Sequence, residues 1–143
     1  VVPVYVDGMV RDINIVYTRN PTFLKNALGK RILRGGEPFY TKEIQPVAPS
    51  QNREALLETK GAAVIVSSSG MLTGGPSMQY AKKLVQSEDA CIIITGYQDE
   101  ESPGRQLLNL LENKEERKIT LDGTTIPVKC RVEQVGLSAH GDK

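Results

Sequence analysis

The sequence predicts an α/β fold with a mainly parallel β-sheet flanked by helices and an antiparallel hairpin at the sheet edge. Ala62–Val66 and Ala90–Thr95 are apolar runs without polar alternation, which is typical of parallel strands buried on both faces. After each run, a proline (Pro76 or Pro103) stands at a position where helices commonly begin. Asp122–Thr125 lies between two β-type runs and favours a hairpin.

The first third of the chain predicts a strand and two helices. Val2–Val6 is a short β-branched run, and from Met9 to about Leu28 apolar residues recur near helical spacing. Pro21 should end or kink the first helix, and Thr22 can cap the second.

The next segment holds one more predicted helix. Phe39–Ile44 is ambiguous, and Pro46–Pro49 reads as an extended linker. Ser50 is suited to cap a helix over Asn52–Thr59.

The last third predicts the edge hairpin. Its strands are Lys118–Leu121 and Ile126–Cys130, with Arg131–Val135 continuing the second strand and Gly136 opening a closing loop. The elements together predict a three-layer arrangement of the Rossmann or flavodoxin kind.

Composition and charge restrict the classes of function. The 143 residues match a single domain, and the net charge of +1 would not by itself attract nucleic acid, so phosphate binding would need a local site. The chain lacks Trp and has few aromatic residues, which argues against a broad base-stacking platform. It contains no long apolar run that would span a membrane. We interpret Cys91 and Cys130 as buried, reduced thiols of a cytoplasmic protein.

The first candidate site is Ser67–Ser77, which lies between a predicted strand and the following helix. Ligands of such sheets bind outside the strand ends. Small residues let backbone N–H groups approach an anion, and a helix start favours negative charge. The sequence does not match the P-loop. A flexible turn without a ligand is the alternative.

The second candidate site is Gly96–Arg105, where Asp99–Glu101 precede a helix start. Arg105 could bind a phosphate through two N–H groups. The alternative is a solvated approach to the helix in which the acids interact with its dipole.

The third candidate site is Gly136–Asp142, which contains the only histidine, His140. Ser138 and Asp142 flank it, and Asp142 could orient the imidazole for general acid catalysis. A structural histidine is the alternative. One imidazole cannot form a histidine-based zinc site.

Four motifs in order resemble the β-CASP domain of metallo-β-lactamase-fold nucleases, a family that includes RNase J-type enzymes and the nuclease of mRNA 3′-end cleavage. They cover nearly the whole chain, and the Ser-Gly-Met form favours a prokaryotic member. The motifs are Val2–Met9, Ser68–Gly75, Gly96-Tyr97-Gln98 with Gly104-Arg105, and Ser138–Asp142.

This resemblance implies a domain that clamps RNA over two zinc ions held by a metallo-β-lactamase domain of the same protein, outside this fragment. His140 would act beside the metals on the leaving oxygen, and Ser138 would contact the scissile phosphate. The RNA channel would be lined by Ser68, Ser69, Gly70 and Met71. The fragment itself would hold no cofactor and would be inactive alone, and the full-length enzyme could be a homodimer.

Two departures from the family pattern affect packing and charge. Leu137 and Gly141 replace the usual Phe and Ala beside the serine and histidine, and Asp99–Glu101 is more acidic than usual. The rival hypotheses are a stand-alone nucleotide- or phosphate-binding module and an inactive scaffolding paralogue.

Overall fold

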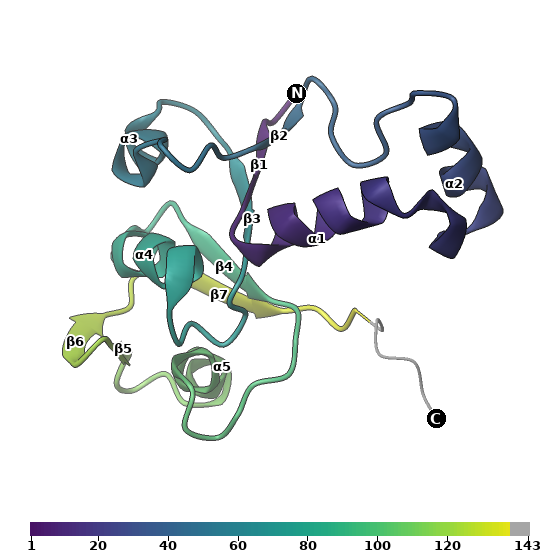
Figure 1. The fold of residues 1–143 in the computed structure, drawn as a ribbon. Helices are drawn as coiled ribbons and strands as arrows, with labels where there is room; N and C mark the ends of the chain where they lie inside the picture. Colours follow the sequence, from purple (N-terminus) through teal and green to yellow (C-terminus); the bar gives the residue numbers. More distant parts are fainter. Residues whose placement is uncertain (138–143) are drawn as a thin grey trace. The chain divides into compact units, whose positions relative to one another are not determined.

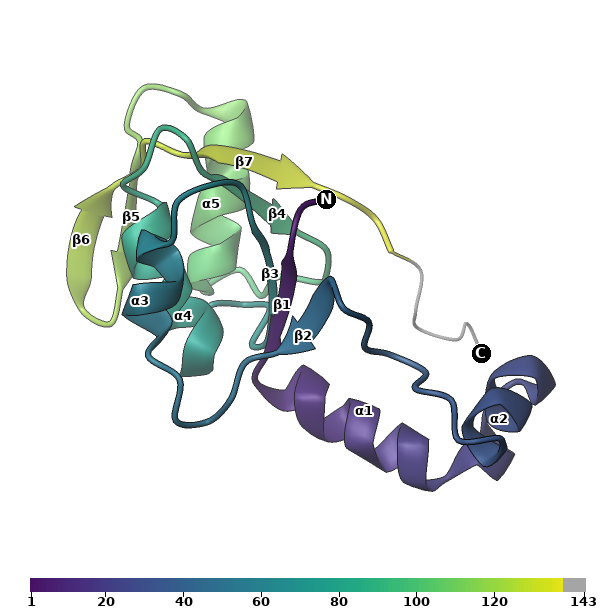
Figure 2. The same ribbon diagram turned by 90° about the horizontal axis from the view of Figure 1, so that it is seen from above.

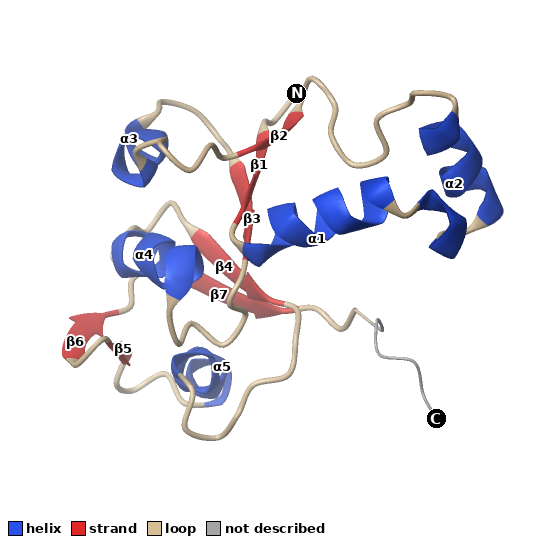
Figure 3. Cartoon of the chain, viewed as in Figure 1, coloured by secondary structure: helices blue, strands red, loops and turns tan. Residues whose placement is uncertain are grey.

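The computed structural model describes residues 1–137 of the chain. They form two compact units, Val1–Ser68 and Ser69–Lys143, the second described as far as Leu137. Helices and strands of both units are shown in Figure 3. The α/β class is confirmed, with parallel strands, packed helices and one antiparallel hairpin.

Three parallel strands form the sheet of the first unit (Figures 1 and 2). The central strand β1 (Val4–Asp7) pairs with β2 (Ile44–Pro46) on one side and with β3 (Val64–Ser67) on the other. The β1–β3 register sets Asp7 beside Ser67. The carboxyl ends of both strands therefore meet at one edge of this sheet.

The helices of the first unit begin and end close to the predicted positions. α1 (Met9–Arg19) ends before Pro21, which starts the short 3-10 helix η1 (Pro21–Phe23). Thr22 lies inside η1 and does not cap α2 (Asn26–Leu33). The predicted cap at Ser50 is also wrong, because α3 (Arg53–Glu58) is capped by Asn52, whose Oδ1 accepts from Glu54 N at 2.9 Å.

The second unit is built on the parallel pair β4 (Cys91–Ile94) and β7 (Arg131–Gln134). α4 (Gly75–Leu84) contacts β4, and α5 (Pro103–Glu112) contacts β7. Ser102 caps α5, since its Oγ accepts from Arg105 N at 3.2 Å. The core of this unit consists of buried apolar side chains from these elements, from the segments that flank α4 and from the hairpin described next. Among them are Leu72, Val85, Ile94, Leu107, Leu108, Ile119, Leu121 and Val132.

The hairpin of the second unit consists of β5 (Lys118–Leu121) and β6 (Thr124–Pro127). Its turn is shorter than predicted, because only Asp122 and Gly123 lie between the strands, with φ of 51° and 73°. Two positive φ values are typical of the two-residue turns that match strand twist. Arg131–Val135 does not continue this hairpin; it supplies β7, which pairs with β4 instead.

Burial corrects two further expectations. The apolar strands are not buried on both faces: exposure alternates, and Val64, Val66 and Ile93 are 47%, 44% and 55% exposed. The reason is that the helices of each unit leave one face of these strands uncovered. Cys130 is buried but Cys91 is exposed, and both are free thiols. Within residues 1–137, no helix has the length and apolar character needed to cross a membrane.

Candidate functional site

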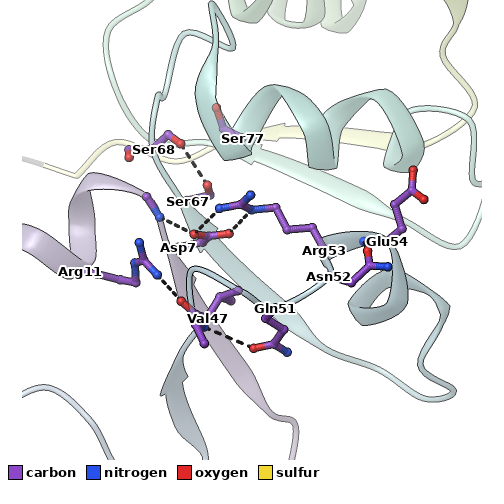
Figure 4. Close-up of polar contacts among 12 residues, drawn as sticks. Asp7, Arg11, Val47, Gln51, Asn52, Arg53, Glu54, Ser67, Ser68 and Ser77 are labelled. Atoms are coloured by element: carbon purple, nitrogen blue, oxygen red, sulfur yellow. Dashed lines mark hydrogen bonds and ion pairs between the residues drawn. The ribbon is translucent and has the colours of Figure 1, made fainter.

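A buried ion pair fixes the carboxyl end of β1 in the first unit (Figure 4). The Asp7 carboxylate is 0% exposed and accepts from Arg53 Nε at 2.7 Å and from Arg53 Nη2 at 3.2 Å. Gly8 N also donates to Asp7 Oδ1 at 2.7 Å. This fork geometry is the strong form of an Arg–carboxylate contact, so it holds the turn from β1 into α1.

Ser68 lies at the end of β3 and contacts the same turn within this unit. Its Oγ accepts from Met9 N at 2.8 Å, while the Ser67 hydroxyl donates to Ser68 O at 3.0 Å. Gly8 has a φ of 77°, a left-handed conformation that glycine adopts readily. Because a serine hydroxyl carries one proton and two lone pairs, Ser68 remains able to donate its proton to a ligand.

In the second unit, the loop Ser69–Gly74 is fixed through three successive carbonyl groups. Ser69 O accepts from the Ser77 hydroxyl at 2.6 Å, and Gly70 O accepts from Gln98 Nε2 at 3.1 Å. Met71 O accepts from the N–H of Gly104 at 3.1 Å. The loop is therefore held on its carbonyl side by α4, by the loop after β4 and by α5.

The opposite side of this loop carries N–H groups. In a trans peptide the N–H points opposite to the preceding C=O, so the N–H groups of Gly70 and Met71 point away from Ser77 and Gln98. Gly70 is exposed, and a Cβ built on it would meet nothing within 4 Å. α4 follows directly, and its N-cap residue, Gly74, makes no side-chain cap. Such a start is favourable for anions.

Leu72 is the left-handed residue of the loop. It has a φ of 59°, which is uncommon for a residue with a side chain, and it is 6% exposed. Leu72 N donates to Ser69 O at 3.2 Å, closing a turn. Burial of the leucine side chain in the core thus offsets the backbone strain.

Gln98 connects this loop to α5. It is 1% exposed, and its Oε1 lies 3.4 Å from the Ser102 hydroxyl. Gly104 packs against it so closely that a Cβ at position 104 would lie 1.8 Å from Gln98 Oε1. Arg105 Nη2 donates to Gln98 O at 2.7 Å. The guanidinium of Arg105 is therefore turned at least partly toward the protein backbone.

The predicted site residues lie in different parts of the molecule. Ser68 belongs to the first unit, and the other described members, Ser69, Gly70, Met71 and Arg105, belong to the second. Ser138 and His140 lie outside the described residues. Asp99–Glu101 are exposed, and Asp99 O accepts a hydrogen bond from the Ser102 hydroxyl at 2.8 Å. The roles assigned to all of these residues stay predictions.

The contacts of two important groups were not predicted from the sequence. The Asp7–Arg53 pair spans 46 positions, and no local pattern connects its members. Gln98 had a signal, because Gly104 stands in the first turn of a helix, where glycine is a poor helix former. A glycine there indicates a close approach by another group.

The ionisable groups of the described part give no metal site. Nowhere in residues 1–137 do three or more His, Cys, Asp or Glu side chains gather to hold a metal ion. Burial raises the pKa of the Cys130 thiol, and the positive charge of the Arg117 guanidinium lowers the same pKa by a smaller amount.

Comparison with known proteins gives the class of this chain. Residues 1–107 match the Beta-Casp domain family, and the chain belongs to that family. It is 34% identical to transcription termination factor FttA of Pyrococcus horikoshii over 146 residues, covering 99% of this chain and 22% of that protein. It is 35% identical to FttA of Methanocaldococcus jannaschii over 145 residues, covering 99% of this chain and 23% of that protein. The chain thus spans about a fifth of the length of these relatives.

Proposed function

We propose that this chain is the RNA-clamping domain of a zinc-dependent ribonuclease. In this proposal, a metallo-β-lactamase domain of the same protein holds two zinc ions and this domain binds the RNA backbone. Zinc would supply a polarised phosphate and a hydroxide nucleophile. Family membership over residues 1–107 supports the assignment. The name of the FttA relatives, transcription termination factor, suggests that the RNA is a nascent transcript.

The observation that carries the proposal is the fixed loop Ser69–Gly74. Gln98 and Ser77 hold its carbonyl groups, and the exposed Gly70 leaves room for a phosphate beside the outward N–H groups. Successive backbone N–H groups near a helix start form anion-binding concavities. The loop therefore suits an RNA phosphate and needs no base contact.

The remaining roles follow from the resemblance. Ser138 would contact the scissile phosphate, and His140 would protonate or stabilise the leaving oxygen. We also propose that Ser68 donates its hydroxyl proton to the backbone of the RNA. The two free thiols agree with a reducing compartment such as the cytoplasm, and a homodimer of the full-length enzyme is part of the same proposal.

Gly70→Val in the full-length protein tests the RNA clamp. Position 70 has open space around its Cβ and no left-handed φ, so the variant should fold normally. A branched side chain there would keep a phosphate away from the N–H groups, and RNA affinity should fall roughly tenfold, as for one lost charge-assisted contact. Affinity is measured by fluorescence anisotropy with a labelled single-stranded RNA.

The matched control is Ala62→Val, which adds comparable bulk at an exposed position before β3. It should leave RNA affinity unchanged. Equal affinity of Gly70→Val and the wild-type protein would remove this loop from the RNA path.

A further inference from the structure

The amino end of β7 carries a second feature that the proposed clamp does not use. A surface hollow there, which we term the basic hollow, has four cationic side chains and one carboxylate in its lining: Lys114, Arg117, Lys129, Arg131 and Glu133. The rest of its lining is Cys130 and apolar residues of α5 and β7. The whole chain has a net charge of only +1, so this excess of positive charge is local. Cations around a hollow attract anions more strongly than the same cations on a flat surface.

Arg117 is the fixed cation of the basic hollow. Its Nε donates to Val128 O at 3.1 Å and its Nη2 to Cys130 O at 2.7 Å. Carbonyl groups orient the guanidinium without neutralising its charge. A guanidinium has five N–H donors, so Arg117 keeps donors for a ligand after making these two contacts.

Two carboxylates at or near the basic hollow, Glu133 and Glu116, are each paired with an exposed cation. Glu133 pairs with Arg131 at 3.1 Å, and both side chains are more than half exposed, so the pair is weak and easily opened. Glu116 pairs with Lys118 at 2.9 Å, and that contact lowers the pKa of Glu116. Lys114 and Lys129 are exposed and remain available to a ligand.

The basic hollow lies away from another hollow in the described part of the second unit. β4 and β7 run parallel from Cys91 and Arg131. The second hollow is lined by Thr95–Tyr97 and Gln134–Leu137, at the carboxyl ends of both strands. A four-residue strand spans roughly 10 Å. The basic hollow therefore stands at the opposite end of β7 from the segment that leads to Ser138 and His140.

We propose that the basic hollow is a second binding site for the phosphate backbone of RNA. Arginine and lysine are the residues that neutralise backbone phosphates, and arginine binds them in a fork. A contact at this end of β7 would hold the RNA at a point remote from the Ser69–Gly74 loop. The proposal rests on the proposed function for the nature of its ligand, but the site is a separate one.

The salt dependence of RNA binding tests the basic hollow in the full-length protein. Lys114→Gln with Lys129→Gln removes two exposed charges from it. Lys42→Gln with Lys60→Gln removes two exposed charges in the first unit and is the matched control. Both double variants are titrated with a labelled single-stranded oligouridylate at several salt concentrations. The first should bind roughly tenfold more weakly at low salt, with a slope of log K against log salt reduced by about 0.7 for each lost phosphate contact. The control should keep the wild-type slope.

Each outcome decides between the proposals. Equal slopes for the two double variants, with normal RNA binding by the wild-type protein, would overturn the basic hollow and leave the clamp intact. Polyglutamate is titrated in parallel; if the first double variant loses affinity for polyglutamate but keeps the affinity of the wild-type protein for RNA, the result would indicate an acidic protein partner and would also overturn the basic hollow. A wild-type protein that binds no RNA at any salt concentration would overturn the proposed function itself, and the basic hollow with it.

Discussion

Gly104 and Gln98 fit together so closely that a side chain at position 104 requires the Gln98 side chain to move. A Cβ at position 104 would lie 1.8 Å from Oε1 and 2.6 Å from Cδ of Gln98. The same Gln98 side chain donates to Gly70 O at 3.1 Å. The packing of α5 is thereby connected to the loop that we propose as the RNA clamp.

Gly104→Ala should destabilise the second unit by about 1–3 kcal/mol, because the added methyl group displaces Gln98 from its place. In a Gln98→Ala background the clash is absent. The same glycine substitution should then be neutral or slightly stabilising, since alanine is the better helix former. Hydrogen exchange of the α5 amides in the full-length protein measures both effects.

A strong coupling between the two substitutions is therefore expected. The control is Asn109→Ala, an exposed position of α5, which should be additive with Gln98→Ala. If the effects of Gly104→Ala and Gln98→Ala are additive, the two residues do not form the tight contact described.

Arg53→Ala should lower the free energy of unfolding of the first unit by about 3–5 kcal/mol, because it leaves the fully buried Asp7 carboxylate without its bidentate partner. Arg53→Lys should cost less, since it keeps the charge but loses the fork. Hydrogen exchange of the β1 and β3 amides reports the loss. A cost below about 0.5 kcal/mol for Arg53→Ala would mean that the ion pair does not hold this edge of the sheet.

Cys130 makes stability depend on pH in the alkaline range. Burial raises the pKa of its thiol, so the folded protein keeps the proton at a pH where the unfolded thiol, with a pKa of about 8.5, loses it. The folded state then binds more protons than the unfolded state, and the free energy of unfolding falls as the pH rises above about 8.5.

The measurement compares Tm of the wild-type full-length protein and of Cys130→Ala between about pH 7 and about pH 10. The wild-type protein should lose more stability over this range than the variant does. Cys91→Ala is the control, because Cys91 is exposed, and it should follow the wild-type curve. Parallel curves for wild type and Cys130→Ala would contradict the burial argument.

His140→Ala in the full-length protein should lower the turnover of RNA cleavage by about 10²–10⁴, the usual contribution of general acid–base catalysis. The zinc content should stay unchanged, because the proposed zinc ions are bound by another domain. Cleavage and bound zinc are measured on the same preparation. Undiminished cleavage would remove His140 from the chemistry, and RNA binding without cleavage by the wild-type protein would favour a termination factor that acts by binding alone.

Local signals predicted the local structure well. Ser102 and Pro103 start α5 where the sequence indicated, because a cap and a proline act within one helical turn. For α3, the sequence predicts Ser50 as the cap, two residues before the observed cap Asn52, because serine and asparagine are equally good caps by residue type.

Long-range pairing could not be predicted in the same way. The sequence predicts that Arg131–Val135 continues a hairpin strand, yet Arg131–Gln134 pairs with β4, 40 residues earlier at Cys91↔Arg131. Parallel partners are distant in sequence and leave no turn pattern between them. The contacts of Gln98 and Arg53 could not be predicted for the same reason, whereas the motifs around Gly70 and Arg105 could be proposed as sites because their residue types are themselves informative.

The left-handed Leu72 has a consequence for the kinetics of ligand capture. Its side chain is sequestered in the core, so the backbone beside Gly70 acquires its shape during folding and loses little further conformational freedom when a ligand arrives. Preformed sites of this kind bind without a slow rearrangement. The encounter rate with a polyanion should then be limited by diffusion and orientation alone.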